Sequence, residues 1–171
     1  MKTTVVILLA IIAIGVAIAA RLGGFMRVGI AEEEMGPFTL VYRDAAAGEM
    51  IRVGTITTAL DSLLQAQRFT SRKPLDVFMP NGTGEIGFAV YGVSSDRLAS
   101  LGDVAKVRTI PAQRFMSASF PWRNHMSLIV GYLKTNHALA AYRATRGYSK
   151  VETLALTDGD RIIYMQPIAH R

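Results

Sequence analysis

Residues 76–91 read DVFMPNGTGEIGFAVY, and they carry the strongest structural signal in the sequence. Two runs rich in β-branched and aromatic residues, 76–79 and 85–91, enclose the turn-forming residues PNGTG. Strand-forming runs on either side of such a turn are typical of a β-hairpin. We therefore expect two antiparallel strands here.

The residues before this hairpin predict a strand followed by a helix. Residues 38–42 read FTLVY, a short β-branched and aromatic run. Apolar residues between positions 56 and 67 then recur at the spacing of one helix face, and Pro74 ends that pattern. The first half of the chain, about 38–93, therefore has the predicted order β-α-β-β.

The second half, about 106–168, repeats this order. Its expected elements are a strand at 106–110 pairing with 114–120 across Pro111-Ala112, a helical stripe over 126–133, a short helix from Asn136 as N-cap to Gly147, and a hairpin of 151–157 with 161–166. Two copies of one unit imply pseudo-twofold symmetry. The predicted fold class is α+β, with duplicated β-α-β-β units, an antiparallel sheet and helices over one face. The crevice between the units is the expected ligand site.

The N-terminal segment differs in character from the rest. Residues 3–20 carry no charge, and as a helix they would extend about 27 Å, close to the hydrocarbon thickness of a bilayer. We expect an uncleaved transmembrane anchor over 1–26, a juxtamembrane linker over 27–37 and a folded domain over 38–171. The alternative is a signal peptide cleaved near Ala19. The lipid bilayer is thus an expected partner of residues 3–20.

Composition excludes several kinds of chemistry. The 171 residues suffice for one ordinary domain, and they contain no cysteine, which excludes disulfides, Cys-based zinc sites, iron–sulfur centres and thiol nucleophiles. The net charge is +6, but Lys and Arg are scattered, so we expect no nucleic-acid partner. The spacing of His125, His137 and His170 fits no metal-binding pattern, so we expect neither a metal nor a cofactor.

Several short motifs carry a family resemblance. They are Val41-Tyr42-Arg43 followed by Gly48, Ile110-Pro111-Ala112, and the terminal run from Ile163 to Ile168. Their order resembles the GyrI-like small-molecule-binding domain, the effector-binding module of bacterial multidrug-responsive regulators, over about 38–168. Phe120-Pro121-Trp122, His137-Ala138-Leu139 and Tyr142 are similar to the membrane-anchored GyrI-like subgroup that includes the animal reticulophagy receptor.

The resemblance implies a cleft lined by aromatic residues that binds amphipathic or cationic organic molecules. Its expected lining residues are Tyr42, Glu85, Phe120, Trp122, Tyr132 and Tyr164. Aromatic residues at a strand–helix junction, such as Phe120 and Trp122, more often pack in a core than contact a ligand. The alternative for Tyr42 and Tyr164 is a hydroxyl that reaches water at the sheet edge, and for Glu85 a solvent-exposed carboxylate, so these interpretations stay open. The family often has an acid facing the cleft in the terminal strand, and Ile163 stands at the matching position here.

Three functional hypotheses follow. The first is a membrane-anchored domain that binds an amphipathic molecule or a protein partner without catalysis. The second is a hydrolase of electrophilic small molecules, with Glu85 or Asp44 as the acid and Trp122 and Tyr42 shaping the site. The third is haem or tetrapyrrole binding, which would involve His125. The resemblance places the domain on the cytoplasmic face of the cell membrane, whereas cleavage near Ala19 would place it outside.

Overall fold

The computed structural model describes residues 2–21 and 23–169, with side chains described except at 2, 3, 19, 50, 51 and 125. Met1, Leu22, His170 and Arg171, which belong to the expected anchor and domain, lie outside the described residues. The elements are α1 (Lys2–Arg21), β1 (Ala31–Met35), β2 (Phe38–Ala45), η1 (Glu49–Arg52), α2 (Val53–Ala66), β3 (Arg72–Phe78), β4 (Gly84–Val90), α3 (Ser95–Ala99), η2 (Gly102–Val104), β5 (Lys106–Ile110), β6 (Gln113–Pro121), α4 (His125–Arg146), β7 (Thr153–Asp158) and β8 (Arg161–Pro167).

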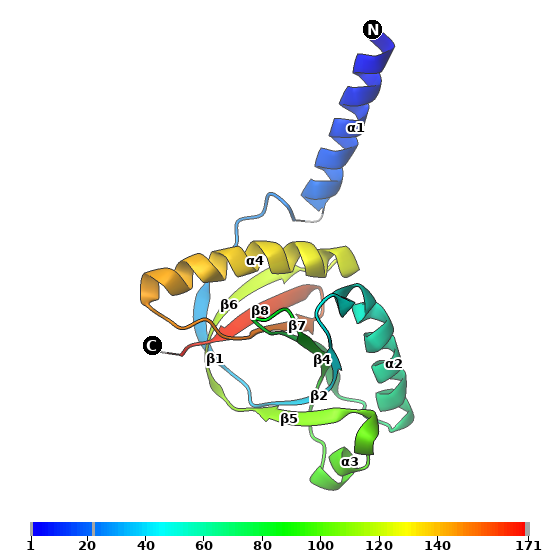
Figure 1. Ribbon diagram of the computed structural model, residues 1–171, viewed down its shortest axis with the longest axis vertical. Coiled ribbons are helices and arrows are strands. Elements are labelled where there is room, and N and C mark those ends of the chain that lie inside the picture. Colours follow the sequence, from blue (N-terminus) through cyan, green and yellow to red (C-terminus); the bar gives the residue numbers. More distant parts are fainter. Residues whose placement is uncertain (1, 22, 170–171) are drawn as a thin grey trace.

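One antiparallel sheet organises the fold, and it curls so that α2 and α4 lie on its outside (Figure 1). The strand order is β1-β6-β8-β7-β3-β4-β2-β5. The units β2-α2-β3-β4 and β6-α4-β7-β8 meet where β3 pairs with β7, and the order reads symmetrically outward from that contact. The structure therefore confirms the α+β class and the duplicated unit.

The two outer strands are exchanged between the units. β1 comes before the first unit but pairs with β6 of the second, and β5 comes before the second unit but pairs with β2 of the first. The expected pairing of 106–110 with 114–120 is therefore wrong. The link at Pro111-Ala112 joins two strands that pair with different partners, β5 with β2 and β6 with β1 and β8. It passes close to the link at Gly36, where a Cβ would lie 3.1 Å from the Pro111 carbonyl oxygen.

The strand β1 lies in a segment that the sequence indicated only as a linker. Its central residues are Glu32, Glu33 and Glu34, which have low strand propensity. In the structure, Ser117 donates a hydrogen bond to Glu33 on one face of the sheet. On the other face, Glu32 accepts hydrogen bonds from the hydroxyls of Tyr142 and Tyr148, both at 3.1 Å.

The helix α4 is continuous, whereas the sequence suggested two shorter helices. It begins at a capping box in which Asn124 accepts a hydrogen bond from the Ser127 backbone and the Ser127 side chain accepts one in return. The expected N-cap Asn136 lies inside the helix and accepts a hydrogen bond from Gln166 Nε2 at 3.3 Å. The predicted C-terminal cap is confirmed, because Gly147 has φ of 71°, a conformation that glycine adopts without strain.

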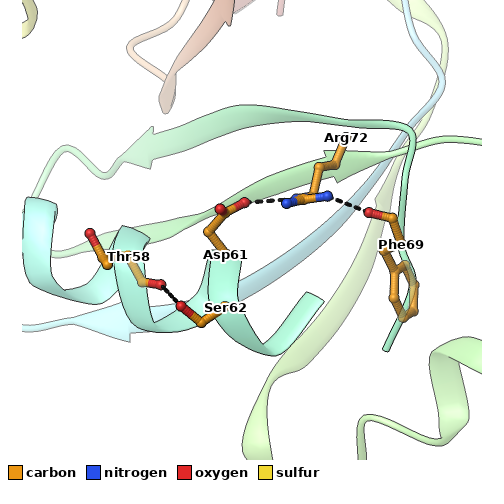
Figure 2. A network of polar contacts seen from close by, with 5 residues as sticks. All are labelled: Thr58, Asp61, Ser62, Phe69 and Arg72. Carbon is orange, nitrogen blue, oxygen red and sulfur yellow. Dashed lines mark hydrogen bonds and ion pairs between the residues drawn. The ribbon is translucent and has the colours of Figure 1, made fainter. Parts of the chain in front are cut away.

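The helix α2 is fastened to the start of β3 by one arginine (Figure 2). Arg72 Nε donates to Asp61 Oδ1 at 2.7 Å, and another nitrogen of the same guanidinium donates to the Phe69 carbonyl. On the outer side of α2, the Ser62 hydroxyl bonds back to the Thr58 carbonyl at 2.9 Å. The helix thus presents a polar surface away from the sheet.

The core divides between the two faces of the sheet. The outer face, which the helices cover, holds one buried cluster beneath α4 around Phe120, Leu139 and Tyr164, and another beneath α2 around Leu60 and Phe88. A third cluster lies on the opposite, inner face, and its buried members all come from strands. This helix-free inner face is where the sheet curls around itself (Figure 1).

The helix α1 projects from the domain beyond α4 (Figure 1). Its large apolar side chains between Val5 and Ile18 are exposed to between 51% and 64%. Across the part of the chain that the structure describes, no helix combines the length and hydropathy needed to cross a membrane, so the expected transmembrane helix is not confirmed.

Candidate functional site on the inner face

The inner face offers an apolar floor with a polar edge. Its buried members are Phe38, Leu40, Leu75, Val77, Ala89, Ile110, Phe115, Leu154, Leu156, Ile163 and Met165. Alternate residues of a strand point to the same face, so Tyr42 and Glu85 join this set by their register with its neighbours. Tyr42 packs directly against the cluster. An aromatic ring and a carboxylate therefore stand at one border of the floor.

A shared arginine sets the charge of that border. Arg108 Nε donates to Glu85 Oε2 at 2.7 Å, and Arg108 Nη2 donates to Glu152 Oε2 at 3.1 Å. The Glu85 side chain is 11% exposed, that of Glu152 22% and that of Arg108 30%. Two carboxylates thus share one guanidinium in a shielded position. The group carries one formal negative charge within a chain whose net charge is +6.

Burial perturbs the ionisation of these groups. Burial raises the pKa of Glu85 above its ordinary value, and Arg108 offsets the rise only in part. The pKa of Tyr42 is raised as well, first by burial and then by the negative charge of Glu85. For Arg108, burial alone would lower the pKa, but Glu152 and Glu85 outweigh it and raise the value. The guanidinium therefore stays charged, and an added cation beside Glu85 would favour the ionised form of its carboxylate.

An open groove of about 550 Å³ continues from this border along the start of β5. Its lining residues are Tyr42, Leu98, Ala99, Gly102, Asp103, Ala105, Lys106 and Val107. Tyr42 belongs both to the groove and to the inner face. Lys106 forms an exposed ion pair with Asp44 at the same end of β2. None of the buried members of the apolar floor lines the groove, and Ala105 belongs to the cluster beneath α2.

The structure separates the expected lining residues into two groups. Tyr42 and Glu85 lie on the inner face, whereas Phe120, Trp122, Tyr132 and Tyr164 belong to the cluster beneath α4. The ring centroids of Tyr132 and Phe78 are 4.5 Å apart, and those of Tyr132 and Tyr164 are 6.5 Å apart. The Tyr164 hydroxyl donates to the Leu128 carbonyl at 2.6 Å, and burial raises its pKa. These four aromatics anchor α4 to the sheet.

Ile163, the residue of the terminal strand that the resemblance singled out, also lies on the inner face. Ile163 is a buried member of the apolar floor. Its strand, β8, is the pseudo-twofold counterpart of β4, which carries Glu85. The carboxylate of the inner face, Glu85, therefore lies on β4, whereas the equivalent strand β8 has the apolar Ile163.

Sequence reasoning missed Arg108 and Glu152. They come from segments distant from each other and from Glu85, and only the pairing of β5 with β2 brings Arg108 over the inner face. The alternation of residues along 106–110 was the available signal, since it puts Lys106, Arg108 and Ile110 on one face of the strand.

Of the residues in the hydrolase hypothesis, Tyr42, Asp44 and Glu85 share the inner face, where Asp44 lies opposite Glu85 in the strand register, but Trp122 does not join them. Glu85 lies on the inner face and Trp122 packs against the cluster on the outer face, while Asp44 is exposed and paired with Lys106. The side chain of His125 lies outside the described residues. Among the side chains that are described, no three of the types His, Cys, Asp and Glu come together as a metal ion would require.

Comparison with known proteins identifies the fold. No family model matches the chain, and no curated protein matches it. Among solved structures, SAV2435 bound to tetraphenylphosphonium matches with a TM-score of 0.60 and 14% identity, over 82% of this chain and 93% of that one. The EcmrR C-terminal domain matches with a TM-score of 0.63 and 12% identity, over 85% of this chain and all (100%) of that domain. A bacterial transcription regulation protein described as putative, from Staphylococcus aureus MU50, matches with a TM-score of 0.57 and 13% identity, over 82% of this chain and 98% of that one.

The chain thus has the fold of the GyrI-like effector-binding domains. At these identities the likeness concerns the fold. It supports the GyrI-like resemblance but not the membrane-anchored subgroup.

Proposed function

We propose that this chain is a non-catalytic binding module whose inner face takes a lipophilic organic cation. The observation that carries the proposal is Glu85, a shielded carboxylate with a raised pKa beside Tyr42 and an apolar floor. An aromatic face and an incompletely neutralised carboxylate attract a cation, while the floor takes its apolar groups. SAV2435, which has the same fold, was solved with the lipophilic cation tetraphenylphosphonium.

The site distinguishes the proposed ligand from other small molecules by charge. The Glu85–Arg108–Glu152 group has one negative charge in excess, so a lipophilic anion of the same shape would meet repulsion. A neutral molecule would gain only the apolar contact. We therefore expect the order cation, neutral molecule, anion in binding strength.

Binding of tetraphenylphosphonium to the full chain in detergent micelles, measured by equilibrium dialysis, tests the proposal. Tetraphenylborate is the matched anion. Glu85→Gln should weaken cation binding roughly tenfold, as expected for one shielded charge interaction of 1–2 kcal/mol. Tyr132→Phe, which keeps the ring packed beneath α4, is the control variant.

Three results would contradict the proposal. Equal affinities for tetraphenylphosphonium and tetraphenylborate would show that the site does not select its ligand by charge. A loss of affinity in Tyr132→Phe but not in Glu85→Gln would move the site to the outer face. If neither ion binds, a protein partner becomes the better hypothesis for this module.

We also propose that the chain is held at the cell membrane through α1, with the folded domain on the cytoplasmic side. The apolar side chains that α1 exposes around the helix support this location, because such a surface is stable in lipid and costly in water. Export after cleavage near Ala19 is the alternative.

A compartment-specific reporter fused after Arg171 tests this location. Activity only in the cytoplasm, together with recovery of the fusion in the membrane fraction, supports the proposal. Activity outside the cell, with loss of the first 19 or so residues in the mature chain, supports export instead.

A further inference from the structure

Large apolar side chains are exposed at few places on this molecule. Besides α1, most of them lie on one helix and the segment before the domain: Met126, Ile129 and Leu133 on α4, exposed to 52%, 52% and 65%, and Phe25 and Met26, exposed to 70% and 38%. The three α4 residues follow the spacing i, i+3, i+7 and form one stripe along the helix. Together the five residues are called the α4 patch.

Two contacts fix the segment of Phe25 and Met26 beside α4. Lys134 Nζ donates to the carbonyl of Gly23 at 3.1 Å and also to that of Gly24. Gly23 lies so close to the Phe120 ring that a Cβ there would be 2.9 Å from it. The chain therefore leaves α1 directly over α4, as Figure 1 shows.

The charged residues nearest in sequence to the α4 patch, Arg27, Arg123 and Lys134, are positive. Arg143 and Arg146 lie farther along α4, where Arg143 donates to Gln166 and Arg146 lies over the Tyr142 ring. The sequence of α4, residues 125–146, contains Lys134, Arg143 and Arg146 and no Asp or Glu. Arg27 and Arg123 are exposed close in sequence to the patch. An apolar stripe bordered by cations is the pattern of a helix that lies on an anionic lipid surface.

The repeat offers an internal comparison. The counterpart helix α2 exposes Thr55, Thr58, Ala59 and Ser62 on its outer side, and none of these is large and apolar. The Thr58 hydroxyl donates to the Gly54 carbonyl, and the Ser62 hydroxyl donates to the Thr58 carbonyl (Figure 2). The fold therefore does not require an apolar outer stripe. Of the two helices α2 and α4, only α4, which lies next to α1, has an apolar outer stripe.

We propose that the α4 patch lies against the surface of a bilayer with anionic headgroups, so that α4 runs in the membrane plane. The patch continues the apolar surface of α1, and the cations around it meet the headgroups. The inner face then points away from the lipid, because it is the opposite face of the sheet. The inference rests on the proposed membrane location.

The absence of cysteine allows a direct test by single-site labelling. Three variants of the full chain, Ile129→Cys on α4, Ala59→Cys on α2 and Ile11→Cys on α1, are labelled with the environment-sensitive dye NBD. Each is reconstituted into vesicles of phosphatidylcholine alone or with phosphatidylglycerol. Emission and quenching by lipids with a spin label near the headgroup are recorded.

We expect the label at Ile129→Cys to gain severalfold in intensity and to be quenched in the anionic vesicles, while the label at Ala59→Cys stays unchanged. Adding Leu133→Glu to the Ile129→Cys chain should abolish the gain. Equal signals at Ile129→Cys and Ala59→Cys would overturn the inference. A gain without lipid that grows with protein concentration would also overturn it, in favour of a second copy on the patch.

The label at Ile11→Cys keeps the two membrane proposals apart. A lipid signal there without one at Ile129→Cys leaves the location standing and overturns the α4 contact. A signal at Ile129→Cys without one at Ile11→Cys supports the contact and overturns the role of α1.

Discussion

Arg108 reaches across β2 to donate a hydrogen bond to Glu85, at 2.7 Å between Nε and Oε2. The two residues belong to β5 and β4, which pair with opposite edges of β2. This contact holds a carboxylate over the inner face and compensates its charge. The chemistry of the site depends on how much of that charge the guanidinium cancels.

Removing the guanidinium should strengthen cation binding and weaken the fold. Arg108→Gln leaves Glu85 and Glu152 without their shared partner, so tetraphenylphosphonium should bind roughly fivefold more tightly at neutral pH. An unpaired, shielded carboxylate should lower the free energy of unfolding by about 1–3 kcal/mol. Equilibrium dialysis and urea unfolding measure the two effects. Lys106→Gln, which breaks an exposed pair, is the control, and weaker cation binding in Arg108→Gln would contradict the assignment.

Asp76 should make the protein less stable as the pH rises from about 4 to 7. Its side chain is buried beneath the helices and accepts a hydrogen bond from the Gly87 backbone at 3.3 Å. Burial raises its pKa from 3.8 to about 7. In this range the unfolded chain has released the proton and the folded chain has not, so rising pH favours unfolding.

Asp76→Asn removes this titration while keeping an acceptor for Gly87. The variant should therefore gain stability relative to the natural chain as the pH rises, by at most on the order of 4 kcal/mol above pH 7. Urea unfolding at pH 4 and pH 8 measures the change. Asp160→Asn, at an exposed turn, is the control, and a constant difference between the two pH values would refute the role of Asp76.

Glu32 should make the protein more stable as the pH rises, which is opposite to the effect of Asp76. Burial alone would raise its pKa, but hydrogen bonds from Tyr142 and Tyr148 and the charge of Arg114 lower it. A lowered pKa gives stability that is present at neutral pH and is lost as the pH falls through the folded value. Glu32→Gln should therefore speed hydrogen exchange of β1 amides at pH 7 and have little effect in acid. Glu34→Gln, in the same strand, is the control and should leave the hydrogen exchange of β1 amides unchanged at pH 7 and in acid.

Gly131 should not accept a side chain. It is buried in α4 against the sheet, where a Cβ would lie 2.7 Å from the Tyr164 hydroxyl and 2.8 Å from the Phe120 ring. Gly131→Ala should lower the free energy of unfolding by on the order of 2 kcal/mol, although alanine is the better helix former. Gly29→Ala, with no atom within 4 Å of the added carbon, should unfold at the same urea concentration as the natural chain.

Local sequence patterns predicted most of the helices and strands, but apart from the two hairpins they did not predict which strands pair with each other. The hairpin around Asn81 and the helix end at Gly147 follow from turn and cap chemistry, which neighbouring residues determine. The strand at Glu32 and the partner of Arg108 depend on pairing between distant segments, which local propensity does not report. Tyr42 and Tyr164 were expected in one cleft. They lie on opposite faces because the face of a strand residue depends on its register.

The exchange of β1 and β5 ties the two halves of the chain together. A cut between β4 and β5 would give two fragments, each holding the strand that completes the sheet edge of the other. Neither half is therefore a free-standing module, and neither can be transplanted into another protein alone. The duplicated pattern in the sequence describes two copies of a unit, but the smallest piece that can fold as an intact sheet is the pair.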